Sequence, residues 1–111
     1  MASSRSPFAH ASEAELARLL DFYGIPWQYE PRSFPIAWDE RRRPVEFFTP
    51  DFYLPEYDLY IELTVAKPIR NTRKNRKVRL LRDSHPHVNV KLFTKRDVER
   101  LFSRAARARA S

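Results

Sequence analysis

Two acidic side chains in neighbouring apolar segments are the part of this sequence best suited to chemistry. Asp51 follows Thr49–Pro50 at the start of one expected strand, and Glu62 lies within the next one, between isoleucine and leucine. Burying an unpartnered carboxylate in an apolar strand is costly, unless its pKa shifts until the group is neutral. A cation or a metal ion is the usual remedy. Two such acids on adjacent strands of a basic chain suggest a hard divalent ion held beside a phosphodiester.

Each of these acids also has an ordinary structural interpretation. Asp51 follows a proline, where aspartate commonly stabilises a turn. Glu62 could be a partly exposed strand residue paired with an arginine, although its apolar neighbours favour a ligand role. A third acid, Glu13, falls in the first turn of an expected helix, where a negative charge suits the helix dipole.

The composition predicts one folded domain. A length of 111 residues allows a single modest core, and the apolar content of 42% is typical of a folded chain. Without cysteine there is neither a disulfide nor a thiolate metal site, and the three histidines lack zinc-like spacing. No apolar run approaches the ~20 residues of a membrane span. We therefore expect a soluble, cytoplasmic protein that has no membrane partner and no haem or nucleotide cofactor.

The positive charge of the chain is concentrated in one segment. The formal net charge is +7 at pH 7, and residues 67–82 contain eight basic residues without an intervening acid. The other 13 basic residues nearly balance the 14 acidic ones. Because a solvated helix face would normally mix both signs, this segment predicts a polyanionic partner such as nucleic acid.

The N-terminal half is expected to contain a tail, a helix and three strands. Residues 1–11 are small and polar, and we expect a flexible tail there. Ser12 and Glu15 fit a capping box, which predicts a helix from Ser12 to about Tyr23, ended by Gly24 as a left-handed cap.

Alternating bulky and polar residues predict the first strand over 27–34. A charged hairpin loop follows at 39–44, and a second strand, interrupted near the proline, covers 45–53. Residues 58–65 form a third strand that is nearly all apolar and is therefore expected to be central.

The C-terminal half is expected to continue as helix, strand and helix. The basic segment predicts a helix ending near residue 83, and alternation over 88–93 predicts a strand. This strand is reached through a helix, so it should lie parallel to the strand carrying Glu62. A capping pattern opens the last helix at residue 94, and residues 104–111 should fray into a basic tail. The order α-β-β-β-α-β-α predicts a three-layer α/β domain over 12–103 with a mixed sheet.

Several motifs in this order are similar to those of a known nuclease superfamily. Glu13 lies eleven positions before Gly24–Ile25, residues 49–55 read Thr-Pro-Asp-Phe-Tyr-Leu-Pro, residues 60–62 read Tyr-Ile-Glu, and His85–Pro86 precedes the last strand. The chain thereby resembles the PD-(D/E)xK nucleases, and among them the phage endonuclease I type of Holliday-junction resolvase. The resemblance covers most of the expected domain.

The resemblance implies a restriction-endonuclease-like core and metal-dependent cleavage of DNA, including branched DNA, by a homodimer. It implies that Asp51, Glu62 and the carbonyl of Leu63 bind Mg²⁺ or Mn²⁺, and that Glu13 completes a second metal position or holds a water. The basic segment would hold the phosphate backbone. The residues assigned to that role are Arg70, Arg73, Lys74, Arg76, Lys77 and Arg79.

One position departs from the family pattern. The family has a lysine two residues after the glutamate, where it orients the attacking water and stabilises negative charge, but this chain has Thr64. Lys67 is included among the candidate catalytic residues as a replacement. Lys74 or Lys77 from the basic helix, or Lys91 from the neighbouring strand, could supply the amine instead. The alternative is a catalytically inactive domain that binds nucleic acid or regulates a partner.

Overall fold

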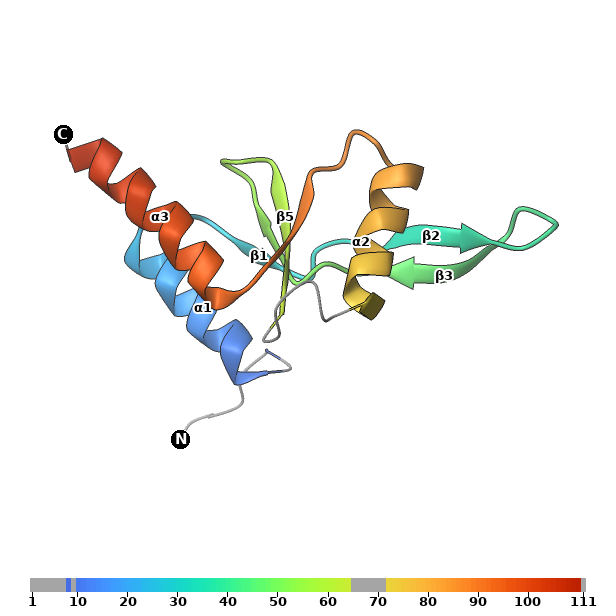
Figure 1. Ribbon diagram of the computed structural model, residues 1–111, viewed down its shortest axis with the longest axis horizontal. Coiled ribbons are helices and arrows are strands. Elements are labelled where there is room, and N and C mark those ends of the chain that lie inside the picture. Colours follow the sequence, from blue (N-terminus) through green and yellow to red (C-terminus); the bar gives the residue numbers. More distant parts are fainter. Residues whose placement is uncertain (1–7, 9, 65–71, 111) are drawn as a thin grey trace.

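The chain folds as an α/β domain with helices on both sides of a mixed sheet (Figure 1). The computed structural model describes residue 8, residues 10–64 and residues 72–110, with side chains up to residue 104. Its elements, in chain order, are α1 (Ala11–Phe22), β1 (Gln28–Tyr29), β2 (Phe34–Trp38), β3 (Pro44–Phe48), β4 (Phe52–Leu54), β5 (Leu59–Leu63), α2 (Thr72–Ser84), β6 (Val90–Phe93) and α3 (Lys95–Ala110).

Four strands form the main sheet, in the order β1-β4-β5-β6. Strand β4 pairs antiparallel with β1 and β5, whereas β5 and β6 are parallel. The parallel pairing was predicted from the intervening helix and is confirmed, as is the central position of β5. Strands β2 and β3 form a separate antiparallel hairpin.

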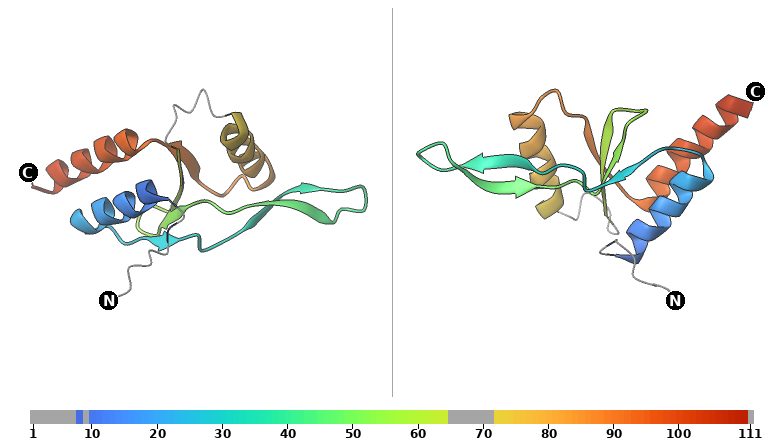
Figure 2. Two further views of the ribbon diagram at one scale, coloured as in Figure 1. Left: turned by 90° about the horizontal axis from the view of Figure 1, so that it is seen from below. Right: turned by 180° about the vertical axis from the view of Figure 1, so that it is seen from behind.

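Two apolar clusters hold these elements together, one on each side of the sheet. Helices α1 and α3 lie side by side on one face, where Leu16, Leu20 and Phe102 join residues of β4 and β5 (Figures 1 and 2). On the other side, Val78 and Leu81 of α2 pack with residues of the hairpin and β6. In the part of the chain that the structure describes, no helix has the length and apolar character of a membrane span.

The structure contains more strands than the predicted order. The first expected strand, over 27–34, ends after β1, where Glu30 has a positive φ of 44° and is followed by a proline, and β2 from Phe34 to Trp38 was not predicted. The second breaks at Thr49–Pro50, which separates β3 from β4 and sends them to different sheets. Proline cannot donate a hydrogen bond to a strand ladder, so both breaks occur at or beside one.

The start of α1 also differs from the prediction, whereas its end is confirmed. His10 occupies the N-cap position of the helix and makes no side-chain capping hydrogen bond. The prediction that Ser12 caps the helix was therefore wrong. Gly24 adopts the expected left-handed conformation, with φ of 69°. The Ile25 N–H then donates to the Leu20 carbonyl at 2.9 Å and closes the last turn.

Helix α3 begins as predicted but extends further. The Thr94 N–H donates to Asp97 Oδ2 at 3.0 Å, and the Asp97 N–H donates to Thr94 Oγ1 at 3.2 Å, which is the expected reciprocal cap. We expected fraying from residue 104, but the helix runs to Ala110. Alanine and arginine are strong helix formers, and they dominate this segment.

One residue of the expected N-terminal tail lies against the domain. The ring of Phe8 packs edge-on against Tyr29, with centroids 4.7 Å apart, and its centroid is 5.9 Å from that of Phe52. Residues 1–7 and 9 of that tail lie outside the described residues.

Candidate functional site

Strands β4 and β5 bring the two central acids together. Their register pairs Phe52 with Ile61, so Asp51 lies opposite Glu62 at the end of β5. The Asp51 N–H donates to Glu62 Oε1 at 3.2 Å, and the Leu63 N–H donates to Asp51 Oδ2 at 2.8 Å. Only 7% of each acid's surface is exposed. The two carboxylates therefore form a buried pair directly beside the Leu63 backbone.

Helix α1 contributes the third predicted acid, Glu13, from its first turn. Its carboxylate is buried and accepts a hydrogen bond from the Tyr29 hydroxyl at 2.8 Å. The Glu13 side chain lies close enough to Asp51 to affect the pKa of that acid. No role was predicted for Tyr29 from the sequence, because its contact with Glu13 depends on how β1 pairs at the sheet edge.

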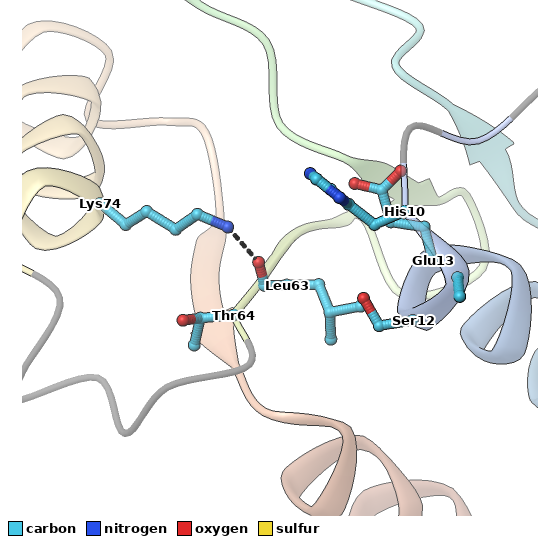
Figure 3. Close-up of a pocket in the computed structure, with 7 residues that line it drawn as sticks. His10, Ser12, Glu13, Leu63, Thr64 and Lys74 are labelled. Carbon is cyan, nitrogen blue, oxygen red and sulfur yellow. Dashed lines mark hydrogen bonds between the residues drawn. The ribbon is translucent and has the colours of Figure 1, made fainter.

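Lys74 of α2 supplies a positive charge to the same place. Its Nζ donates to the Leu63 carbonyl at 2.5 Å and lies 3.6 Å from Glu62 Oε2. Figure 3 shows the side chain extending from α2 to that carbonyl, on the opposite side of β5 from Glu13. The sequence assigned Lys74 mainly to phosphate binding and considered it as one of several replacement lysines. Its place at the carboxylates is decided by the packing of α2.

The other candidate lysines lie elsewhere. Lys77 lies over the Phe48 ring, with its Nζ 6.0 Å from the ring centroid. Lys91 is exposed on β6, where it pairs with Ile61 rather than with a site acid. Lys67 lies outside the described residues.

Thr64 directly follows β5, at the position where the nuclease motif has its lysine. Its side chain is buried, and its N–H donates to the Phe93 carbonyl at 2.8 Å. Residues two apart in a strand point to the same face, so Thr64 follows Glu62 on that face. A hydroxyl there carries no charge, and the ammonium of Lys74 is the cation at the carboxylates.

Burial raises the pKa values of both central acids. For Asp51, burial and the neighbouring Glu13 outweigh the Leu63 N–H hydrogen bond and the Lys74 charge, and the pKa rises to about 6. For Glu62, burial and the charge of Asp51 outweigh Lys74, and the pKa rises to about 8. Lys74 therefore offsets only part of the cost of holding the two carboxylates together.

A pocket of about 340 Å³ opens beside these groups (Figure 3). It lies between the start of α1, the end of β5 and the side chain of Lys74. Its lining residues are His10, Ala11, Ser12, Glu13, Leu63, Thr64 and Lys74. His10 was not among the sequence candidates, because a single exposed histidine before a helix has no distinctive pattern.

The basic residues of α2 have different environments. Arg76 makes a bidentate pair with Glu46 of β3, at 2.9 and 3.0 Å. Arg73 and Arg79 are exposed and form no hydrogen bond or ion pair with any described residue. Arg70 lies outside the described residues. Among the predicted phosphate ligands, Arg73 and Arg79 are therefore the ones best placed to meet a polyanion.

The donor set at the carboxylates suits a hard divalent ion. Asp51, Glu62 and the Leu63 carbonyl offer oxygen atoms, which Mg²⁺ and Mn²⁺ prefer. The raised pKa values show that further positive charge would be stabilising there. Across the described residues, no three acidic, histidine or cysteine side chains form a ready-made metal cluster. One ligand of this set would thus be a backbone oxygen.

No protein-family model, curated protein or solved structure matches this chain.

Proposed function

We propose that this chain is a metal-dependent endonuclease-like protein that hydrolyses DNA phosphodiester bonds, with branched DNA as a candidate substrate. The observation that carries the proposal is the convergence of Asp51, Glu62, the Leu63 carbonyl and Lys74 at the end of β5. Few structural roles require two buried carboxylates so incompletely neutralised. Strongly perturbed carboxylates beside a pocket are typical of functional sites.

The carboxylates and the Leu63 carbonyl would hold Mg²⁺ or Mn²⁺, and Glu13 would complete a second position or hold a water. When bound, such an ion polarises the phosphoryl oxygen and lowers the pKa of a bound water. The Tyr29 hydroxyl keeps the Glu13 carboxylate oriented toward Asp51.

Lys74 would take the role of the lysine of the nuclease motif, whose position is occupied by Thr64 in this chain. In the structure, its ammonium hydrogen bonds to the Leu63 carbonyl and lies near Glu62. To act in catalysis, the amine must release that carbonyl and turn toward the substrate phosphate. There it would orient the attacking water and stabilise the charge that develops on the phosphoryl oxygens.

The test is cleavage of a labelled four-way junction and its parent duplex with Mg²⁺, with Mn²⁺ and with EDTA. We expect metal-dependent cutting that is lost in Glu62→Gln and reduced at least a hundredfold in Lys74→Ala, on the scale of a lost acid–base group. Lys91→Ala is the matched control, because it removes the same charge away from the site. Equal activity of Lys74→Ala and Lys91→Ala would show that Lys74 has no catalytic role.

Thr64 supports a second candidate, a domain that binds nucleic acid without cutting it. Its hydroxyl cannot supply the missing charge, and the Lys74 amine is already engaged by the Leu63 carbonyl and by Glu62. Under this alternative, the same substrates would be bound but left intact under every metal condition. A Thr64→Lys variant that gains cleavage would then show that only the lysine was missing.

A homodimer also belongs to the proposal, because a four-way junction presents two equivalent strands to cut and two symmetric copies would match it. Its test is the mass of the free protein and of its junction complex by sedimentation velocity.

A further inference from the structure

The β2–β3 hairpin projects from the rest of the domain (Figures 1 and 2). Its base is fixed, because Phe34, Ile36 and Phe48 are buried against Val78 and Leu81 of α2. Its far end carries the turn 39–43, whose residues are exposed apart from the half-buried Asp39. A projecting arm with an anchored base is suited to contacting something outside the domain.

The tip of the hairpin presents two arginines that have no partner among the described residues. Both carboxylate oxygens of Asp39 are hydrogen bonded within the turn. Its Oδ1 accepts hydrogen bonds from the backbone N–H groups of Arg41 and Arg43 at 2.9 Å, and its Oδ2 accepts one from the Arg43 side chain at 3.1 Å. The side chains of Arg41 and Arg42 form no hydrogen bond or ion pair with any described residue. Glu40 is the remaining acid of the tip, so the tip keeps a net positive charge.

The turn itself does not require arginine at its most constrained position. Arg42 has a positive φ of 63°, a conformation that glycine or asparagine adopts at lower cost. Placing a long cationic side chain there costs stability and points to a role outside the fold.

Aromatic and apolar groups lie along the arm beside these charges. Val45 and Phe47 are 60% and 54% exposed, and Trp38 is 44% exposed beside the turn. Exposed arginines close to exposed aromatic side chains are typical of surfaces that contact nucleic-acid backbones and bases. On the other side of β3, the Glu46–Arg76 pair fixes the arm relative to the basic helix α2.

We propose that the β2–β3 hairpin contacts DNA in addition to helix α2. It binds duplex flanking the candidate site through Arg41 and Arg42. The inference rests on the proposed function, since the base of the arm leads directly into Asp51 through Thr49–Pro50. The seven residues from Arg42 to Phe48 are separated by six steps of about 3.3 Å, so the tip lies ~20 Å from the base of the arm. At about 3.4 Å per base pair, the tip would meet phosphates roughly 6 base pairs beyond the base of the arm.

The experiment measures the affinity of the full chain for duplexes from about 8 to 30 base pairs, at several salt concentrations and in EDTA. We expect Arg41→Ala/Arg42→Ala to weaken binding to the longest duplex about tenfold and to leave the shortest nearly unchanged. Losing two phosphate contacts should reduce the slope of log K against log salt by about 1.8. Arg96→Ala/Arg100→Ala is the matched control, because it removes two exposed arginines from α3, on the other face of the sheet.

A second variant separates binding from folding. Arg42→Gly should keep or raise the melting temperature, because glycine suits the positive φ, and should still weaken binding to the long duplex. Wild type could bind with a salt-dependent affinity while the double variant binds duplexes of every length equally well. The proposal that the hairpin contacts DNA would then be wrong, and the proposed function would stand. If wild type binds none of these duplexes, the proposal for the arm is wrong, and cleavage of the four-way junction decides the proposed function by itself.

Discussion

At the scale of single residues, Asp51 and Glu62 form a buried acidic pair whose ionised state is costly. Both carboxylates are buried, and Lys74 is the cation that lies beside them. Such a pair favours proton binding when no further cation is present. Its titration and its response to divalent ions are therefore open to measurement.

The first prediction concerns how the free energy of unfolding depends on pH. The folded pKa of Glu62 is about 8, against an ordinary value of 4.5, so the folded chain keeps a proton that the unfolded chain has lost between these values. The free energy of unfolding should therefore fall as pH rises from 4.5 to 8, by on the order of 2–4 kcal/mol. Urea unfolding in EDTA across this range measures it.

Glu62→Gln should flatten this dependence, because the amide keeps the shape of the side chain and does not titrate. Glu56→Gln is the matched control, since Glu56 is exposed on the turn before β5. Parallel stability curves for wild type and Glu62→Gln would show that Glu62 is not the group responsible.

The second prediction concerns divalent ions and needs no substrate. Mn²⁺ at ten times its Kd should stabilise the fold by about 1.4 kcal/mol, which corresponds to a rise in melting temperature of roughly 5–10 °C. The rise should be larger at pH 8 than at pH 6, because protons and the ion compete for Asp51 and Glu62. Asp51→Asn should abolish the rise and Glu56→Gln should keep it. An equal rise in Asp51→Asn would place the ion elsewhere.

At the scale of elements, the ends of the helices were predicted from local chemistry with mixed success. The Gly24 and Thr94 signals are confirmed, because each acts on backbone groups within a few residues. Ser12 had the same kind of signal and does not cap α1, since the helix begins one residue earlier, after His10. A capping pattern thus predicts that a helix begins nearby, but the exact first residue depends on packing.

The third prediction follows from this difference. Thr94→Ala should lower the free energy of unfolding by about 1 kcal/mol, because the first amides of α3 lose their hydroxyl acceptor. Ser12→Ala should have little effect, because Ser12 lies inside the first turn of α1 and is not its cap. Thermal unfolding of both variants compares them. An equal loss in the two would mean that Ser12 stabilises α1 after all.

At the scale of the whole molecule, two elements with exposed arginines lie on the same side of the sheet. Helix α2 carries the exposed Arg73 and Arg79, and the hairpin that packs against it carries the arginines of its tip. The Glu46–Arg76 pair joins the two elements. A polyanion that contacts both would lie across the same side.

The fourth prediction tests the helical part of this surface. Arg73→Ala/Arg79→Ala should reduce the slope of log K against log salt for DNA binding by about 1.8, because two phosphate contacts are lost. Affinity should fall for short and long duplexes alike, unlike the loss expected for the hairpin variant. Fluorescence anisotropy in EDTA measures both, with Arg96→Ala/Arg100→Ala as the control of equal charge. An unchanged slope would exclude these arginines as phosphate contacts.

Features that depend on short-range order could be predicted from the amino-acid sequence. Asp51 and Glu62 lie side by side because they belong to two short strands joined by a tight turn. Strands β5 and β6 are parallel because the chain crosses between them through helix α2. Three features became clear from the folded structure alone: Lys74 is the lysine at the carboxylates, Tyr29 hydrogen bonds to Glu13, and β2 and β3 form an arm separate from the main sheet. These contacts join elements whose relative placement is set by packing of whole surfaces, and packing leaves no local pattern in the chain.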